Sequence, residues 1–433
     1  MLHRIVSPHF QIPRWRDAVM NRKSIVGTAE IRRRLGPCCS LPASMATSVG
    51  DRLAHMRDHE RAMVDELAAY VRVESGSRDK AGVDHVGGRL AEAFGSLGFA
   101  IERMPEATSG DHLVARRKGS GRGHLLALIH LDTVWPSGTL AENPFRLEDG
   151  HAFGPGVLDM KGGWVVLLSA LRSLAASGWD GLAQTTVFMS SDEELGSPTA
   201  RSAIERVARD ADWALVMEAA REDGALVTSR GAVGALTVRA HGVTAHSIAA
   251  GKRGASAIRA LASAILDLEA LTERERGVVV SVGIVEGGSA RQVIPDRAWA
   301  SVDLRAPTSA LADATLARIR AILASPSVPS TALILEGGIT RPAWEPNPGT
   351  DRLLDLARRC GGPLGLALRG TASGGGSDGN FTAALGIPTI DGLGPQGANL
   401  TARNEYVAVD SLAPRSALLA GIISGLPSLL SKS

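Results

Sequence analysis

Histidine, aspartate and glutamate side chains follow several apolar runs of this 433-residue chain, where each run ends or in the next loop. The segments are His130-Leu131-Asp132, Gly154 to Gly163 with Asp159 inside it, Asp192-Glu193-Glu194, Glu218, and Gly397 to Tyr406. In an open α/β sheet, sites form at the carboxyl ends of the strands. One imidazole and several carboxylates can share a pocket only around a cation, since unpaired buried charges are costly. These mixed ligands suit Zn²⁺ best, with Mn²⁺ or Co²⁺ as alternatives.

The adjacent pair Glu193-Glu194 indicates a division of labour. Two neighbouring carboxylates do not both point comfortably at one metal ion. We therefore expect one to be a ligand and the other to act as a general base on water. A solvated acidic turn is the alternative for this pair when it is taken by itself.

The elements that must position these residues follow an α/β pattern, with a helix-flanked, mostly parallel sheet. Leu125–Ile129 is a short, wholly apolar run, as is typical of a buried parallel strand. Strands are also expected at Thr185–Ser190 and Ala214–Met217, and helices from Arg52 to Val71, from an N-cap at Asp84 to Leu97, at Trp164–Ala176 and at Asp351–Cys360.

Between about Ser229 and Arg341 the pattern changes to the order β-α-β-β-α-β, which is that of a ferredoxin-like α+β unit. Its expected elements are Ala235–His241, Gly254–Leu271, Val278–Val285, Ala298–Arg305, Pro307–Ala324 and Thr331–Leu335. We therefore expect an inserted domain over residues 229–341. It would divide the larger domain into residues 51–228 and 342–433, after a basic extension over residues 1–50.

Composition excludes several classes of protein. Residues 1–50 carry a net charge of +6 and the rest a net charge of −4, so the folded body is mildly acidic and a nucleic-acid partner is not expected. The three cysteines form no disulfide framework, which favours a cytoplasmic location. No apolar run reaches the ~18–20 residues of a membrane span, so no membrane association is expected. The Arg-rich residues 1–50 favour a disordered extension, with a targeting arm as the alternative.

The chain resembles the co-catalytic zinc metallopeptidases, which include glutamate carboxypeptidases, aminoacylases and succinyl-diaminopimelate desuccinylases. The resemblance lies in His130 to Pro136, Gly154 to Gly163 and Asp192 to Glu194, and it extends over about residues 52–430. Trp135-Pro136, with Gly138-Thr139 and Asn143-Pro144-Phe145 after it, is most similar to the glutamate carboxypeptidase branch. The resemblance implies a catalytic domain with two Zn²⁺ ions and an inserted dimerisation domain.

The resemblance also implies a role for each matching residue of the metal centre. His130 and Glu218 would bind one metal ion, Glu194 would bind the second, and Asp159 would bridge both. Asp132 would hold the His130 imidazole in one tautomer. Glu193 would be the general base.

Four further residues are implied to contact substrate. His246 would reach the partner subunit's site and help to stabilise the oxyanion. Arg305 and Arg341 would bind a substrate carboxylate through forked hydrogen bonds. Gln292 stands where the family usually has asparagine, and its longer amide side chain would shift such a contact. Taken alone, His246 could be a turn residue, Arg305 a surface residue and Arg341 a marker of the domain hinge.

The C-terminal ligand position departs from the family pattern. The resemblance calls for a histidine about four residues before Glu405, and Thr401 stands there. No histidine follows His246 in the chain, and a neutral hydroxyl is a poor Zn²⁺ ligand. We therefore expect a weakened second metal site, with one or two Zn²⁺ per subunit.

The expected activity is metal-dependent hydrolysis of the amide bond to a C-terminal amino acid, in a small peptide or an N-acyl amino acid, by a homodimer. A metal-poor relative or inactive variant, and a carboxylate-binding protein on the same fold, are the alternatives.

Overall fold

The structure, a computed structural model, describes residues 48–249 and 253–430. Most of the extension expected over residues 1–50 lies outside the described residues, and so do Cys38 and Cys39. Helix α2 (Val49–Asp58) begins within the last residues of the expected extension. It begins there because the Ser48 hydroxyl accepts a hydrogen bond from the Asp51 backbone N–H and caps the helix.

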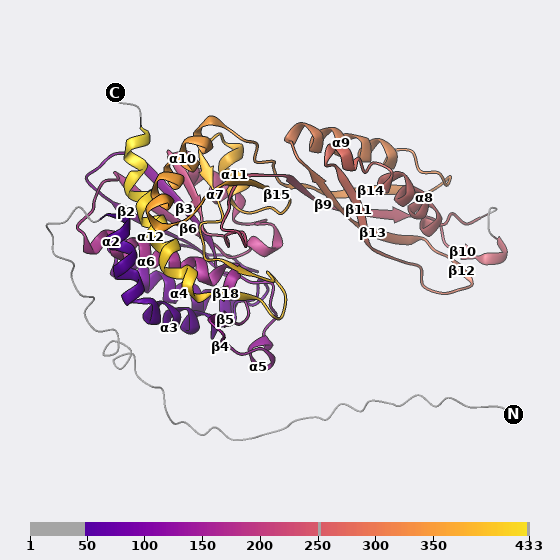
Figure 1. Cartoon of the computed structure of the whole chain (residues 1–433). Helices are drawn as coiled ribbons and strands as arrows, with labels where there is room; N and C mark the ends of the chain where they lie inside the picture. Colours follow the sequence, from indigo (N-terminus) through magenta and orange to yellow (C-terminus); the bar gives the residue numbers. More distant parts are fainter. Residues whose placement is uncertain (1–47, 250–252, 431–433) are drawn as a thin grey trace, which may run out of the picture. The chain divides into compact units, whose positions relative to one another are not determined.

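A six-stranded sheet with strand order β1-β2-β6-β3-β7-β16 forms the centre of the larger part (Figure 1). The strands are β1 Ala100–Met104, β2 His112–Lys118, β3 His124–His130, β6 Gln184–Ser190, β7 Trp213–Val216 and β16 Thr389–Ile390. The neighbours β6, β3, β7 and β16 run parallel, whereas β1 and β2 pair antiparallel at one edge. The expected mostly parallel sheet is confirmed.

Both faces of this sheet are covered, which explains the continuous apolar runs. In β3, Leu125, Ala127 and Ile129 belong to one hydrophobic core, and Leu126 and Leu128 belong to another on the opposite face. Helices α2, α3 (Glu60–Val71), α4 (Lys80–Ser96), α6 (Gly162–Ala176), α10 (Pro348–Gly361) and α12 (Leu412–Gly425) contribute to the first core, and α7 (Arg201–Ala208) and α11 (Gly379–Ala384) to the second.

Two helix boundaries differ from the sequence-based expectation. The helix expected from Arg52 to Val71 is two helices, because the His59 ring bonds to the His55 carbonyl and the His59 backbone N–H turns to Met56. Helix α4 is capped by Asp79, whose carboxylate accepts from the Gly82 N–H, and not by Asp84. Asp84 lies one turn inside α4 and accepts from the Asp111 N–H.

The segment after β8 (Leu226–Arg230) forms a separate four-stranded antiparallel sheet with strand order β11-β13-β9-β14. Its elements are β9 Ala232–His241, α8 Ala257–Glu269, β11 Val279–Gly287, β13 Arg297–Ala306, α9 Ser309–Leu323 and β14 Ala332–Arg341. This element order and strand order are ferredoxin-like. The unit has its own hydrophobic core, in which α8 and α9 cover one face of the sheet. A two-stranded ribbon, β10 (Ala245–His246) and β12 (Val293–Ile294), adjoins it.

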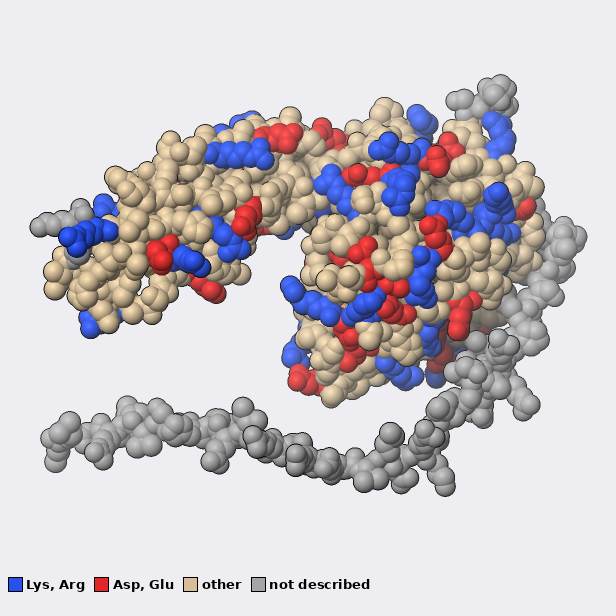
Figure 2. Space-filling model, turned by 180° about the vertical axis from the view of Figure 1, so that it is seen from behind, with Lys and Arg blue, Asp and Glu red and all other residues tan. Residues whose placement is uncertain are grey.

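Short strands and turns carry the remaining loops. Strands β17 (Gly397–Ala398), β18 (Tyr406–Ala408), β5 (His151–Phe153) and β4 (Arg146–Glu148) form one antiparallel sheet, and β15 (Gly370–Ser373) pairs with β8. Helix α5 is a single turn, Thr139–Glu142. On the face of the molecule shown in Figure 2, basic and acidic side chains are mixed, and neither sign covers a continuous area.

One helical stretch, Val409–Leu429, is long and apolar enough to cross a membrane by length and composition alone. Its central helix α12 packs against α2, α6 and α10, and its Leu418, Leu419 and Ile422 are fully buried. These contacts explain its apolar character as that of a core helix.

Candidate functional site

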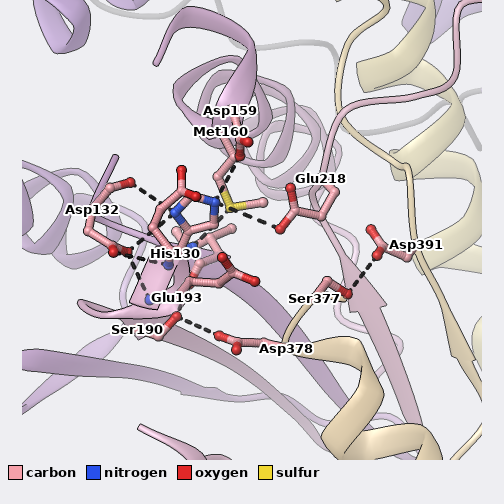
Figure 3. A network of polar contacts seen from close by, with 12 residues as sticks. His130, Asp132, Asp159, Met160, Ser190, Glu193, Glu218, Ser377, Asp378 and Asp391 are labelled. Carbon is pink, nitrogen blue, oxygen red and sulfur yellow. Dashed lines mark hydrogen bonds and ion pairs between the residues drawn. The ribbon is translucent and has the colours of Figure 1, made fainter. Parts of the chain in front are cut away.

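Three neighbouring parallel strands bring the candidate residues together (Figure 3). Strand β3 ends at His130, β6 ends at Ser190 shortly before Glu193 and Glu194, and β7 ends two residues before Glu218. Since β3 pairs with both β6 and β7, these three carboxyl ends meet at one edge of the sheet. Asp159 comes from elsewhere, on the helical turn Val157–Lys161 that precedes α6.

His130 is the centre of this cluster. Its Nε2 atom lies 3.1 Å from Asp159 Oδ1 and 3.7 Å from Glu218 Oε1. Its Nδ1 atom lies 2.9 Å from the backbone carbonyl oxygen of Asp132, to which it can donate. With Nδ1 protonated, the Nε2 lone pair points to the carboxylates, as a metal ligand requires.

The structure changes the part that Asp132 plays. The resemblance implies that its carboxylate holds His130, yet that carboxylate lies 3.5 Å from Nδ1, farther than the carbonyl. The Asp132 carboxylate instead accepts hydrogen bonds from the backbone N–H groups of Glu193 and Glu194, at 3.1 and 3.2 Å. Asp132 is fully buried and therefore orients the Glu193-Glu194 turn as well as the imidazole.

The donor set fits a divalent cation. Ligand atoms of His130, Asp159 and Glu194 all lie within 4.8 Å of one another. Glu194 Oε1 is buried and has no hydrogen-bond partner among the described residues, which marks it as a free ligand atom. One imidazole nitrogen and carboxylate oxygens are the ligands that Zn²⁺ takes in catalytic sites.

The pKa shifts in the cluster also favour a bound cation. Burial, with the neighbouring Asp159, raises the pKa of Glu194 to about 9, and the same two causes raise the pKa of Glu218 well above its usual range. Burial lowers the pKa of His130, but hydrogen bonds to Asp132 and Asp159 outweigh it and raise that pKa. Carboxyls crowded in this way are stabilised by a cation between them.

Glu193, the predicted general base, is held by an ion pair. Its Oε1 atom accepts from Arg341 Nη2 at 2.7 Å, and Arg341 also binds the Glu193 backbone carbonyl at 3.0 Å. Burial raises the pKa of Glu193 to about 7, and the Arg341 charge limits that rise. A carboxylate with a pKa near neutral is suited to take and return a proton.

Arg341 and Arg305 are not placed as free substrate contacts. Arg341 is buried and already binds Glu193 and Asp378, so its guanidinium is not open to a substrate carboxylate in this structure. Arg305 pairs with Asp303 on its own strand, and its side chain is 39% exposed. Its Nη1 atom makes only a long contact, of 3.5 Å, with the Gly374 carbonyl oxygen. Because Arg305 is partly exposed and Arg341 is buried, only Arg305 of the two can turn toward a ligand.

His246 and Gln292 lie side by side on the ribbon of the ferredoxin-like unit. His246 pairs with Val293 across the ribbon, and the Ser247 N–H donates to the Gln292 carbonyl at 2.9 Å. Both side chains are exposed. Among the residues that the structure describes, no hydrogen bond or ion pair joins either side chain to the His130 cluster.

Thr401 lies in an exposed loop and adopts a left-handed backbone conformation, with φ of 60°. Glu405, four residues later, is buried and accepts from the backbone N–H groups of Leu158 and Asp159, at 2.7 and 3.1 Å. This C-terminal loop therefore supports the turn that carries Asp159. It offers no imidazole to the metal centre.

Two of the buried charges that the sequence did not single out contact residues of the site or of the turn that carries Asp159. Asp378 binds Arg341, Ser190 and Ser197, and Lys161 donates to the Val73 carbonyl at 2.7 Å beside the Asp159 turn. The signals were an aspartate after Gly374-Gly375-Gly376 and a lysine inside the glycine-rich segment Gly154 to Gly163. Neither signal alone distinguishes a buried charge from a surface one.

Comparisons with known proteins relate the chain to one peptidase family. A model of peptidase family M20/M25/M40 matches residues 126–425. Carboxypeptidase G2 of Pseudomonas sp. (strain RS-16) is 29% identical over 377 residues, which are 85% of this chain and 90% of that protein. Succinyl-diaminopimelate desuccinylase of Halorhodospira halophila is 29% identical over 358 residues, 78% of this chain and 92% of that protein. The crystal structure of aminopeptidase PepT from Bacillus cereus has the same fold, with a TM-score of 0.68 at 22% identity over 84% of this chain and 98% of that one.

Proposed function

Because the chain belongs to peptidase family M20/M25/M40 and is therefore a hydrolase of peptide or amide bonds, we propose that it releases a C-terminal amino acid from a small peptide or an N-acyl amino acid. The observation that carries the proposal is the group of His130, Asp159 and Glu194, with the unpartnered Glu194 oxygen inside it. The proteins of this family depend on metal, and we propose Zn²⁺ here, with Mn²⁺ or Co²⁺ as alternatives.

His130, Asp159 and Glu194 would hold the ion, with Glu218 within 3.7 Å of the His130 ring. The bound ion supplies Lewis-acid polarisation of the scissile carbonyl. Glu193 takes the proton of the attacking water on its carboxylate and passes it to the leaving amine. Arg341 holds that carboxylate in place through their 2.7 Å contact.

The leaving amino acid is proposed to be glutamate or aspartate, because Trp135-Pro136 and the residues after it resemble the glutamate carboxypeptidase branch and the partly exposed Arg305 can turn toward a carboxylate. A cavity of about 600 Å³ is lined by Leu158, the chain neighbour of Asp159, and by Ala220, two residues after Glu218. We assign the acyl or peptidyl part of the substrate to this cavity.

A homodimer is proposed from the ferredoxin-like unit. Strand β11 is an edge of its sheet and exposes Ile284 and Val285, at 51% and 59%, while Leu266 of the adjacent α8 is 73% exposed. An apolar edge strand is a surface on which a second chain can add. His246 of the partner subunit would then stabilise the oxyanion, and Gln292 would lie beside it. We also propose a cytoplasmic location, which the low cysteine count supports.

Metal content and hydrolysis test the proposal together. Protein purified with Zn²⁺ supplied is expected to hold about one ion per subunit by plasma mass spectrometry, since the grouped His130, Asp159 and Glu194 supply the three protein ligands of one catalytic zinc. It is expected to hydrolyse N-acyl glutamate, and to lose that activity when a chelator removes the metal. Near two ions per subunit would mean that another group completes a second site. No bound metal, or activity that survives complete chelation, would refute the proposal.

A further inference from the structure

Arg341 divides its guanidinium between two buried carboxylates. It is the last residue of β14, and its side chain is 5% exposed. Nη2 donates to Glu193 Oε1 at 2.7 Å, and Nη1 donates to Asp378 Oδ1 at 2.9 Å. The guanidinium also lies 5.1 Å from the centre of the Phe381 ring, which restricts how it can turn.

Asp378 is anchored more firmly than Glu193. Its Oδ2 atom accepts from the Ser190 hydroxyl at 2.6 Å, and its Oδ1 atom accepts from the Ser197 hydroxyl as well as from Arg341. Ser190 is the last residue of β6 and pairs with His130 of β3. Asp378 is therefore tied to the same strand ends that carry the metal centre (Figure 3).

The backbone around Arg341 leaves little room for another arrangement. A Cβ at Gly376 would overlap the Arg341 side chain, so only glycine lets the chain pass there. The Ser197 hydroxyl donates to Asp378 and accepts from Arg341 Nη2 at 3.1 Å. It therefore links the aspartate and the guanidinium a second time. Asp378 thus sets the orientation of Arg341, and Arg341 sets the place of the Glu193 carboxylate.

We propose that Asp378 is a positioning residue that acts through Arg341 to hold Glu193 where it can accept a proton from water. The inference rests on the proposed function, in which Glu193 is the base. It gives Arg341 a positioning role in addition to the substrate contact that the resemblance implies. Without the Asp378 charge, the guanidinium loses one of its two carboxylates, and the base it carries loses its fixed position.

The expected size of the effect follows from geometry. A reacting group displaced by about 1 Å can cost about 10²-fold in rate. The Asp378→Asn variant keeps the shape of the side chain, removes its charge and replaces one acceptor oxygen by an NH₂ group. We expect it to lower kcat about ten- to hundredfold at saturating metal, with KM within about threefold and metal content unchanged, because substrate and metal contact other residues.

A second buried ion pair supplies a matched control. Arg230, at the end of β8, binds Asp391 at 2.5 Å, and both side chains are at most 7% exposed. Arg230 also contacts the Gly375 and Gly376 carbonyls, beside Asp378, but makes no contact with Glu193. Asp391→Asn therefore removes an equally buried charge next to the same loop. It is expected to lower thermal stability as Asp378→Asn does, with a much smaller loss of kcat.

A double-mutant cycle tests the route through Arg341. If Asp378 acts through Arg341, then Asp378→Asn combined with Arg341→Lys is expected to lower kcat no further than Arg341→Lys alone. Additive losses would contradict the route. The milder Ser197→Ala variant, which removes a hydroxyl that contacts both side chains, is expected to lower kcat less and serves if Asp378→Asn fails to fold.

A crystal structure of Asp378→Asn supplies a readout that does not depend on activity. The Glu193 carboxylate is expected to move by about 1 Å or more while His130 and Asp159 stay in place. Glu193 unmoved, kcat unchanged, or a loss matched by Asp391→Asn would overturn the inference. Wild-type protein that binds metal but cleaves no amide would refute the proposed function instead, and the two failures are thus separable.

Discussion

At the scale of single residues, the centre is organised by charge crowding around one imidazole. His130 lies within 3.1 Å of Asp159 and 3.7 Å of Glu218, and Glu194 completes the group of ligand atoms. Glu193 and Glu194 are neighbours in the chain with opposite surroundings, because Glu193 is paired with Arg341 and Glu194 keeps an unpartnered oxygen. This difference favours the proposed roles of Glu193 as base and Glu194 as ligand.

The neighbouring variants Glu193→Gln and Glu194→Gln are expected to differ. Glu193→Gln loses the proton acceptor, so kcat is expected to fall about 10²- to 10⁴-fold with metal content unchanged. Glu194→Gln removes a charged ligand, so metal affinity is expected to fall by more than the about 10- to 100-fold that outer-shell changes cost. Metal titration and steady-state kinetics on both proteins measure this. Equal metal loss in the two variants would contradict the division of labour.

At the scale of elements, the site depends on how loops are tied to the strand ends. Glu405 holds the Asp159 turn by accepting hydrogen bonds from two of its backbone N–H groups. Lys161 adds a hydrogen bond to the Val73 carbonyl. Burial lowers the pKa of Lys161 to about 7. The loop after β3 is tied to α4, because Asp79 caps the helix and also accepts from the Ser137 hydroxyl at 2.7 Å.

Asp79 offers a test of this tie through pH. Hydrogen bonds from Ser137 and the Gly82 N–H hold the pKa of Asp79 below its usual range. A folded-state pKa below the unfolded one stabilises the protein above the unfolded pKa, and this contribution is lost as pH falls through the folded pKa. Asp79→Ala is expected to lower the free energy of unfolding by about 1 kcal/mol at pH 7, and by less in acid.

The matched variant Asp79→Asn keeps a capping side chain without its charge. Chemical denaturation at pH 7 and in mild acid is expected to show a smaller, pH-independent difference between Asp79→Asn and Asp79→Ala. A cost of Asp79→Ala that stays constant with pH would show that the charge of Asp79 contributes nothing to stability.

At the scale of the whole molecule, two hydrophobic cores divide the described chain. The larger part holds the candidate metal centre, and the ferredoxin-like unit holds His246 and Gln292 on an exposed ribbon. Because no hydrogen bond or ion pair within the described part of the chain links His246 to the centre of its own subunit, its proposed role needs a second copy. The exposed β11 edge is the surface proposed for that contact.

Subunit mixing tests this arrangement. Glu193→Ala and His246→Ala proteins are each expected to be inactive, and mixed dimers are expected to recover part of the activity, because one composite site then has both residues. Size-exclusion chromatography with light scattering checks that dimers exchange. Exchanged dimers without recovered activity would contradict a role for His246 across the interface.

The sequence by itself determined the elements and the ligand candidates. Local periodicity placed β3, β6, β7 and the six main elements of the ferredoxin-like unit, since apolar spacing along a few residues encodes strand and helix. It missed β1, whose residues are exposed or half-buried, and β2, which is buried at its start and ends in Arg116-Arg117-Lys118. It also placed the cap of α4 at Asp84, whereas Asp79 caps that helix. His130, Glu193, Glu194 and Glu218 were found because they follow strand ends, and Asp159 because it lies in the glycine-rich segment Gly154 to Gly163. The family resemblance supplied the role expected of each.

Only the tertiary structure decided how charges pair. Arg341 and Glu193 are 148 residues apart, and Ser190 and Asp378 are 188 apart, so no local pattern reveals either contact. Both contacts exist because strand β14 and the loop before α11 return to the carboxyl edge of the sheet. A buried guanidinium must then take whichever carboxylates the fold places beside it. For that reason Arg341, which the resemblance suggests as a substrate contact, lies beside Glu193, the proposed base.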